Sequence, residues 1–452
     1  MVPLAGCFGA AGVRVVTCVA SVVACAAGPI TASGQLPAVP STARAAPTPM
    51  VLGALLRVAE RQSPRTQAAR ALAAAAVARV PGTRRPPDPQ LQFGFMNYDL
   101  ARFAPMDQVG MNQLQLMQMV PVAGKLGLAG QIAESQARAQ DFRAREMGWE
   151  VRNQTAAVFY DLYQVDHTLT VTRETRRLIE DIAQIAEAMY RVGDGRQADV
   201  LRARVEVAKM TGEIVRMEAM RAAQAARLNA VLNNPADSAV GAPVRPVFPG
   251  EVPARDSLLG WARQGRSLLR AADAQVVAAD HAAQLARREI WPDLQVGIQY
   301  GQRPGMAGGT DRMGSLMLGA SVPIFAGSRQ LPMRVEAAAM RAMAEADLAA
   351  MWADTRGRIG ELVAELSRAR SLAQLYRATV LPQAEATVSS ALAAYRVGSI
   401  PLMSLLDDRM TVNRYRQELF ALEADEGKAW AELEMLVGRA LLDPDLVQGE
   451  PR

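Results

Sequence analysis

Two matching stretches decide the fold: "YRVGDGRQADVLRARV" at 190–205 and "YRVGSIPLMSLLDDRM" at 395–410. Each contains Tyr-Arg-Val-Gly, then a short polar turn, and then a segment that restarts with helical spacing. Glycine just past the end of a helix is a common stop, because it accepts the left-handed backbone conformation. The repeated tetrapeptide therefore predicts matching ends of two helical hairpins in a duplicated chain.

Other landmarks recur in the same order. The stretch "LQFGF" at 91–95 matches "LQVGI" at 294–298, which is an offset of 203 (294 − 91). "VPVAGK" and "VPIFAGSR" are offset by 202 (322 − 120), and the two Tyr-Arg-Val-Gly sites by 205 (395 − 190). Because the offset drifts so little, the sequence predicts one structural repeat over 50–253, a second over 254–442 and a C-terminal tail over 443–452.

Each repeat is expected to hold the same elements: an Ala-rich helix, two strands, a very long helix and a shorter return helix. In the first repeat these cover 50–83, 91–98, 113–120, 125–191 and 196–233, and a Pro-rich linker follows at 234–253. In the second repeat they cover 254–289, 294–300, 315–322, 329–396 and 402–441. Each long helix of about 67 residues would extend roughly 100 Å, which is typical of a coiled coil or a tube.

The four predicted strands alternate apolar and polar residues, as in Leu294, Val296, Ile298 and Tyr300 beside Gln295, Gly297 and Gln299. This period of two predicts strands with one apolar face. Four short strands could form a small soluble sheet, but such a sheet would leave exposed edges. Three copies of the chain would supply twelve strands, which is enough to close a barrel, and the pattern is typical of transmembrane barrel strands.

Composition narrows the class of protein. The chain has 452 residues, 50% hydrophobic and 21% charged, with a net charge of +5. The positive charge is arginine spread along the helices, which argues against a nucleic-acid partner. No segment after the N-terminal region holds 18 consecutive apolar residues, so we expect no transmembrane helix in the mature chain.

The N-terminus resembles an export signal. All three cysteines, Cys7, Cys18 and Cys25, lie within an apolar, small-residue stretch that we interpret as a signal peptide over 1–25, followed by a flexible segment over 26–49. "VVAC" ending at Cys25 is similar to a lipoprotein signal, in which the cysteine is acylated. Plain cleavage without a lipid is the alternative, and the sequence leaves both open.

No constellation for catalysis or resident metal binding is evident. His167 and His281 are the only histidines and lie far apart in sequence, whereas such sites need clusters. The stretch "MNQLQLMQMVP" at 111–121 invites a copper interpretation, since thioether sulfur suits Cu(I). Methionine in strands and helices more often serves packing. We therefore predict no enzyme activity, no cofactor and no metal site.

The arrangement resembles the TolC family of outer-membrane efflux proteins over about 50–442. The resemblance rests on the duplication, the strand pairs, "VPIFAG" at 322–327 and the two Tyr-x-Val-Gly ends at 190–201 and 395–406. "QMVPVAGKLGLAG" at 118–130 is similar to a Gln-x-x-Pro-x-x-Gly-Lys stretch of the heavy-metal branch.

The resemblance implies a mainly α fold with a small β part. Three protomers would each give four strands to a twelve-stranded barrel in the outer-membrane lipid, and long helical hairpins would continue as a tube through the periplasm. The protein would be the exit duct of a tripartite efflux system. Its partners would be a periplasmic adaptor (membrane-fusion) protein and an inner-membrane pump, expected to be of the RND type.

The resemblance also assigns roles at the hairpin ends. Two Val-Gly pairs are expected to dock the adaptor: Val192, Gly193, Val397 and Gly398. The family's constricting ring of acidic residues falls on Ser404 and Asp407, of which only Asp407 keeps the charge.

Asp199 matches a family carboxylate that latches the end of the hairpin against its neighbour, with Tyr395 as the expected partner. The family's latch arginine falls on Ile400, which cannot carry charge, and Arg396 or Arg409 is the expected substitute. Helix capping or a solvated charge is the alternative for Asp199 and Asp407.

The alternative function is a soluble periplasmic coiled-coil scaffold that binds partner helices. The cargo is not encoded in these patterns, so metal ions, drugs and secreted proteins all fit.

Overall fold

A computed structural model describes residues 49–99, 101–102, 104–106, 110–245, 247–305 and 308–442. Contacts divide the chain into Met1–Ala46 and Pro47–Arg452, and every described residue belongs to the second unit. The expected signal peptide with Cys25, the segment 26–48 and the tail 443–452 lie outside the described residues.

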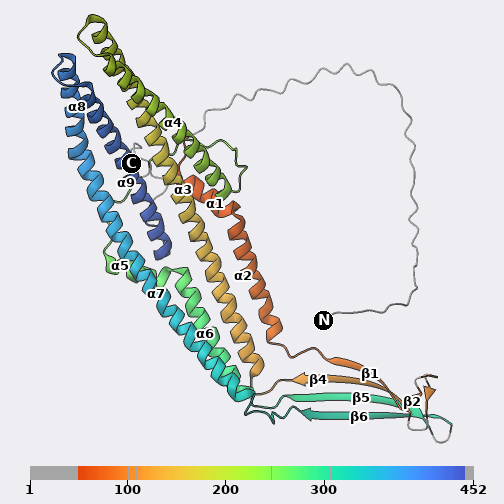
Figure 1. Cartoon of the computed structure of the whole chain (residues 1–452). Coiled ribbons are helices and arrows are strands. Elements are labelled where there is room, and N and C mark those ends of the chain that lie inside the picture. The colour runs from red at the N-terminus through yellow and green to blue at the C-terminus, as the bar shows by residue number, and fades with distance from the viewer. Residues whose placement is uncertain are drawn as a thin grey trace, which may run out of the picture. The chain divides into compact units, whose positions relative to one another are not determined.

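The first hairpin follows the expected order closely. Helix α3 (Lys125–Val192) has 68 residues and ends at Gly193, whose φ of 88° is left-handed. The return helix α4 (Gln197–Val231) packs along α3 (Figure 1). In the second hairpin, α9 (Leu402–Val437) is the return helix, and Gly398 with a φ of 71° precedes it.

The expectation of one regular helix over 329–396 is wrong in detail. The backbone forms α7 (Gln330–Leu375), a π turn (Tyr376–Val380) and α8 (Leu381–Arg396). Pro382, which that expectation overlooked, has no N–H to bond to the carbonyl of Ala378 as a regular helix requires. The wider turn instead lets the N–H of Leu381 bond to the carbonyl of Tyr376, and the helix continues past the proline.

The first helix of each repeat is also divided into two. The segment expected over 50–83 forms α1 (Leu52–Gln62) and α2 (Pro64–Thr83), separated by Ser63 at φ −62°, ψ 120°. The segment expected over 254–289 forms α5 (Arg255–Gly265) and α6 (Ser267–Arg288), separated by Arg266 at φ −64°, ψ 115°. These breaks are offset by 203 residues (266 − 63), so the duplication extends to the backbone conformation.

The helices pack as a row with α3 inside it. Helix α3 packs against α2 and α4 on one side and against α6 and α9 on the other (Figure 1). Helix α7 then packs against α6 and α9, and α8 continues along α9. Short helices lying end to end thus cover each long helix, and the row has two outer edges, α2 with α4 and α7 with α8.

Four strands form one antiparallel sheet in the order β1-β4-β5-β6. Their bounds are Gln90–Met96, Met111–Val120, Leu294–Pro304 and Thr310–Ala320. The strand expected over 91–98 ends at Met96, and a small extra pair, β2 (Tyr98–Asp99) with β3 (Ala104–Pro105), lies between it and β4. The sheet therefore joins the strands of both repeats, through β4 and β5.

The middle of the helical row holds the largest buried side chains. Phe159, Tyr160 and Leu162 of α3 are buried, as is Trp430 of α9. The Pro-rich linker is tied to this region: Met50 forms a parallel bridge to Pro243, with hydrogen bonds of 2.8 and 2.9 Å to its neighbours. Backbone hydrogen bonds therefore anchor the linker 234–253, which contains few secondary-structure elements of its own.

Candidate functional site

The ends of the two hairpins are closed by matching glycine turns. At the first, the N–H groups of Asp194 and Gly195 donate to the carbonyl of Met189 at 2.9 and 3.0 Å. At the second, the N–H of Ser399 donates to the carbonyl of Ala394 at 3.0 Å. Both are helix C-caps in which a left-handed glycine turns the chain so that terminal carbonyls keep a donor.

Each glycine turn presents a valine to solvent. Val192 is 73% exposed and Val397 is 79% exposed. Neither Gly193 nor Gly398 has another atom within 4 Å of where a Cβ would lie, and both have positive φ. The turns predicted as docking sites are therefore open, each exposes one valine, and each is closed by backbone hydrogen bonds.

A shared core lies beneath the two hairpin ends. It combines residues of α3, α4, α8 and α9: Ile179, Ile182, Ala186, Val200, Ala203, Met210, Val388, Ala391, Tyr395, Leu402, Leu405, Leu406 and Val412. Ile400 packs against this core and is partly buried. An apolar contact thus occupies the position where the resemblance places a latch arginine.

Asp199 and Tyr395 come together across the two hairpins. Tyr395 is buried at the end of α8, and Asp199 lies in the first turn of α4. Burial raises the pKa of the Tyr395 phenol, and the negative charge of Asp199 raises it further. The two residues that the resemblance pairs are therefore close enough to interact electrostatically within one chain.

The other two predicted gate residues lie on α9. Ser404 and Asp407 are both exposed. Asp407 lines an open groove between α4 and α9 together with Lys209, Arg216 and Arg414. The carboxylate therefore lies on a solvated surface that also carries cationic side chains. It lies five residues after the start of α9, which is beyond the positions at which a side chain caps a helix.

The two arginines expected as latch substitutes differ in their surroundings. Arg396 is exposed at the end of α8. Arg409 is half-buried, and burial together with the nearby Arg416 lowers its pKa. The carboxylates that oppose this effect are Glu385 and Glu174, so Arg409 faces a charge cluster that does not include Asp199.

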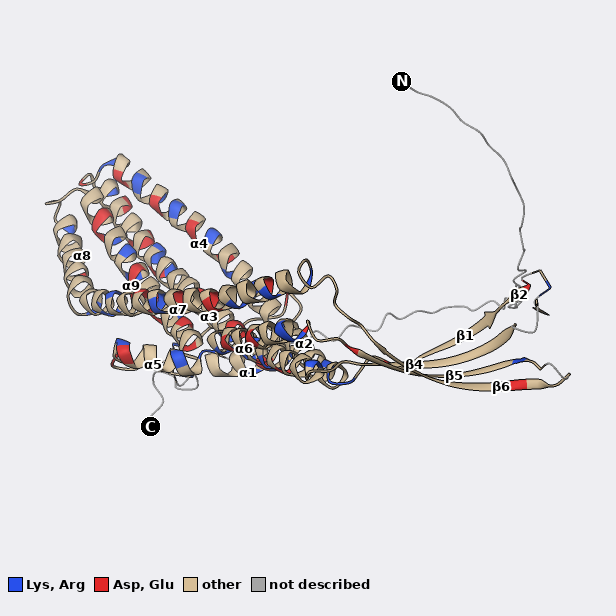
Figure 2. Cartoon of the chain, turned by 90° about the horizontal axis from the view of Figure 1, so that it is seen from below, with Lys and Arg blue, Asp and Glu red and all other residues tan. Residues whose placement is uncertain are grey.

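The strands carry the second candidate surface. One side of the sheet, here called the apolar face, is formed by Leu91, Phe93, Phe95, Leu114, Leu116, Val120, Leu294, Val296, Ile298, Tyr300, Leu316 and Leu318. Phe93 is 72% exposed and Leu318 is 76% exposed. Charged residues within the four strands are confined to the hairpin end of β5 and β6: Arg303, Asp311 and Arg312 (Figure 2).

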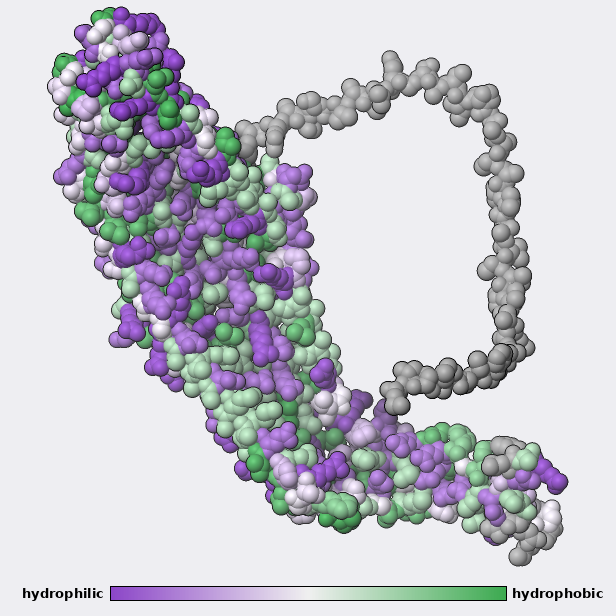
Figure 3. All heavy atoms as spheres, viewed as in Figure 1, coloured by the Kyte–Doolittle hydropathy of each residue, from purple (hydrophilic) through white to green (hydrophobic). Residues whose placement is uncertain are grey.

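Exposed apolar side chains are also present on the outer edges of the helical row, and the surface in Figure 3 shows apolar patches over both the strands and the helices. On α4 the exposed residues are Leu201, Val205, Val215 and Met220. On α7 they are Leu331, Met333, Val335, Met340 and Met343. An exposed apolar area of this extent typically marks an interaction surface.

A buried lysine, Lys125, joins the helices to the sheet. Nζ of Lys125 donates to the carbonyl of Trp291 at 2.8 Å and to Oδ1 of Asp293 at 2.9 Å. Oε2 of Glu289 lies 3.5 Å away. The start of α3 is thereby bound to the segment between α6 and β5, at the junction of the two repeats.

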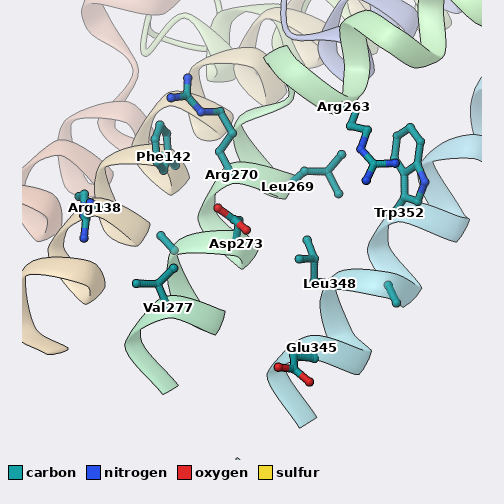
Figure 4. A pocket seen from close by; sticks show the side chains of 12 residues that line it. Arg138, Phe142, Arg263, Leu269, Arg270, Asp273, Val277, Glu345, Leu348 and Trp352 are labelled. Carbon is teal, nitrogen blue, oxygen red and sulfur yellow. The ribbon is translucent and has the colours of Figure 1, made fainter. Parts of the chain in front are cut away.

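A cavity of about 650 Å³ lies among α3, α5, α6 and α7 (Figure 4). The guanidinium carbon of Arg270 lies 4.4 Å from the centre of the Phe142 ring, and that of Arg263 lies 5.5 Å from the centre of the Trp352 ring. The lining combines three arginines with two carboxylates, so its charge does not select one class of ligand.

In the part of the chain that the structure describes, no group of three or more His, Cys, Asp or Glu residues is arranged to hold a metal ion. His167 lies on α3 between the rings of Tyr163 and Phe420, at centroid distances of 4.3 and 4.6 Å. His281 lies on α6. Across the same described residues, every helix is too short or too polar to cross a membrane.

Comparisons with known proteins are consistent with this geometry. Residues 258–439 match a family model described as outer membrane efflux protein. Among curated proteins, none matches the sequence.

Several solved structures share the fold. The chain superposes on CusC, from a study of its folding and transmembrane channel formation, with a TM-score of 0.74 and 14% identity, covering 87% of this chain and 93% of that one. The outer membrane protein VceC of Vibrio cholerae gives a TM-score of 0.71 and 18% identity, covering 86% and 96%. The MtrE outer membrane channel of Neisseria gonorrhoeae, in its open state, gives 0.69 and 14%, covering 86% and 89%. The mainly helical fold with a four-stranded sheet is thereby confirmed.

Proposed function

We propose that the chain is the outer-membrane exit duct of an efflux system, because residues 258–439 match the family model described as outer membrane efflux protein. In this proposal three copies assemble, their sheets close one barrel in the outer membrane, and their helices continue as a tube into the periplasm.

The sheet is the single observation that carries the proposal. It has an exposed apolar face free of charge except at one hairpin end. Its outer strands, β1 and β6, each pair with one neighbour only among the described residues. Exposed strand edges are hazardous in water, whereas pairing β1 of one copy with β6 of the next would satisfy both edges. Three sheets of four strands would close a barrel whose apolar face meets lipid.

The helical row supports the same assembly. Its two outer edges expose apolar residues, for example Val215 on α4 and Val335 on α7, which is 71% exposed. If α7 and α8 of one copy pack against α2 and α4 of the next, these side chains leave water. Burial of apolar area contributes about 25 cal/mol per Å², so these contacts would favour the closed ring.

The hairpin ends are the proposed gate and docking site. Asp407, Ser404, Asp199 and Tyr395 form the gate in this proposal. Val192, Gly193, Val397 and Gly398 contact a periplasmic adaptor protein. The exposed valines and the fixed glycine turns support docking, and symmetric Asp407 carboxylates around an axis would repel one another and attract cations.

The remaining partner is an inner-membrane pump, which we propose to be of the RND type. Acylation of Cys25 would add a lipid anchor to the mature N-terminus. Neither point affects the geometry of the duct, because the sheet and the hairpins lie elsewhere in the chain.

The decisive experiment is fractionation and reconstitution of the full chain. We expect the protein in the outer-membrane fraction, extractable only with detergent, as a stable trimer that forms channels in planar lipid bilayers. A soluble periplasmic scaffold would instead be released by osmotic shock and would remain monomeric in mild detergent with lipid. That result would refute the duct.

A further inference from the structure

Methionine is completely segregated within the four-stranded sheet. The side opposite the apolar face, here called the glutamine–methionine face, carries Gln92, Gln113, Gln115, Gln295, Gln299, Met96, Met111, Met117, Met119, Met313 and Met317. Every methionine within the four strands lies on this face. Every Leu, Ile, Val, Phe and Tyr of the same strands lies on the other face.

This segregation argues against packing as the only role. Methionine that merely filled space would be interchangeable with leucine, and the two would mix between faces. Packing also needs a covering layer, and within the described residues no second layer lies over this sheet (Figure 1). The methionines therefore share their side of the sheet with amides and glycines rather than with other apolar groups.

Two thioether side chains meet above one glycine. The register places Gly297 of β5 between Met117 of β4 and Met317 of β6. Cγ of Met117 lies 3.3 Å, and Cε of Met317 lies 3.4 Å, from the position a Cβ of Gly297 would take. Because glycine leaves that space free, methionines from the two flanking strands converge over the middle strand.

Neighbouring groups hold this arrangement. Nε2 of Gln115 lies 3.9 Å from Sδ of Met317 as a donor. Nε2 of Gln299 donates to Oε1 of Gln113 at 2.6 Å. Four residues further along β5, Met111 occupies the space left by Gly301, with Sδ 2.6 Å from the position of an absent Cβ. The pattern of methionine over glycine thus occurs twice.

Thioether sulfur has a narrow ligand preference. It is a soft, uncharged donor that suits Cu(I) rather than hard cations. Unlike cysteine and histidine ligands, it needs no deprotonation to bind. Two such donors beside side-chain amides would bind such ions weakly and reversibly, as a conduction pathway requires.

We propose that the glutamine–methionine face lines the duct and gives passing soft monovalent cations, Cu(I) or Ag(I), thioether contacts, with Met117 and Met317 above Gly297 as the main pair. This assignment rests on the proposed function, because only a closed wall turns this face toward a lumen. The transported cargo would then be soft monovalent cations, a class that the sequence leaves open. The metal ion would be a substrate that passes through the duct and not a resident cofactor.

The test uses the full chain purified in detergent, with its thiols alkylated beforehand so that cysteine does not bind the probe. Titration with silver nitrate in chloride-free buffer is followed by calorimetry. We expect Ag(I) binding that M117L/M317L weakens by at least about tenfold. The matched control is M340L/M343L, which changes two exposed methionines of α7 and should bind Ag(I) as the original protein does.

X-ray absorption of the Ag(I)-loaded protein supplies a readout that does not depend on a variant folding, and sulfur neighbours are expected around silver. Unchanged binding in M117L/M317L, equal loss in the α7 control, or only oxygen and nitrogen neighbours would each overturn the proposal. Channel conductance of the same samples distinguishes the proposed duct from the proposed thioether contacts. A conducting trimer that does not bind Ag(I) refutes the thioether contacts alone. A chain that binds Ag(I) but forms no channel refutes the duct and with it the lumen.

Discussion

Asp199, in the first turn of α4, lies near enough to the buried phenol of Tyr395 at the end of α8 for its charge to add to burial in raising the pKa of that phenol. We expect D199N to lower the Tyr395 pKa partway toward its ordinary value of 10.0, because the desolvation remains. Spectrophotometric titration of tyrosinate in D199N, with D199N/Y395F subtracted, measures the change. An unmoved titration curve would show that the two residues do not interact.

Asp407 offers a test of the gate. In the proposed trimer, D407A removes three facing carboxylates, so we expect unchanged assembly, higher conductance in planar bilayers and weaker block by divalent cations. The control is D425A on the same helix, where the carboxylate of Asp425 is 49% exposed and 4.0 Å from Arg368. If D407A and D425A conduct alike, Asp407 is not part of the gate.

Gly427 is expected to tolerate no side chain. A Cβ at this position would lie 2.2 Å from Cε1 of the buried Tyr160 ring. We expect G427A to destabilise the fold by about 1–3 kcal/mol through overpacking. G212A on α4, where a Cβ meets nothing within 4 Å, should instead stabilise by up to about 1 kcal/mol through helix propensity. Thermal unfolding followed by circular dichroism distinguishes them, and equal midpoints would contradict the close contact.

Lys125 should be needed for the junction between helices and sheet. K125M leaves the carbonyl of Trp291 and the carboxylate of Asp293 without their donor, which we expect to cost about 2 kcal/mol. K209M removes an exposed lysine paired with Glu206 and should cost less than about 1 kcal/mol. Limited proteolysis at the junction and thermal unfolding both report the loss. A K125M protein as resistant as K209M would refute this role.

Two buried carboxylates predict how stability depends on pH. Burial raises the pKa of Glu146 and of Glu434 above the ordinary value of 4.5. The folded state therefore holds these protons more tightly than the unfolded state. The contribution of the two carboxyl groups to the free energy of unfolding is fully present below about pH 4.5 and is lost as pH rises through the raised folded pKa.

Replacing Glu434 should remove its part of that loss. We expect the unfolding temperature of E434Q to gain on that of the original protein as pH rises from 4, with little difference at the acid end. The amide oxygen that E434Q introduces can still accept the N–H groups of Leu441 and Leu442, which now donate to Oε1 of Glu434 at 2.7 Å each. E251Q, in an exposed part of the linker, is the control and should follow the original protein at every pH.

Much of the fold could be predicted because it depends on periodicity and on glycine. The left-handed turns at Gly193 and Gly398 end the long helices within one residue of their expected positions. The breaks at Ser63 and Arg266 were not predicted. Pro64 indicates the first break, because proline favours the first turn of a helix. No residue near Arg266 indicates the second break, which is recognised only because Arg266 is equivalent to Ser63 in the repeat. The π turn before Pro382 was missed because tertiary packing carries the helix past a residue that ordinarily ends one.

The candidate site could be predicted only in part. The pairing of Asp199 with Tyr395 came from resemblance and stays a prediction, and the electrostatic effect of Asp199 on the Tyr395 pKa supports it. The burial of Lys125 could not be foreseen, because its partners Trp291 and Asp293 lie in the other repeat. The convergence of Met117 and Met317 depends on strand register, which neither strand determines alone.

The equivalent joints at Ser63 and Arg266 have a consequence for the origin of the molecule. Each half contains one jointed helix, one two-stranded ribbon and one hairpin, which makes it a complete building block. For the twelve-stranded barrel proposed above, an ancestor encoding only one such block would require a six-membered ring to close the same circumference. Joining two such blocks through the linker at 234–253 would replace alternate seams of that ring by covalent bonds, and would thereby halve the number of molecules that must assemble.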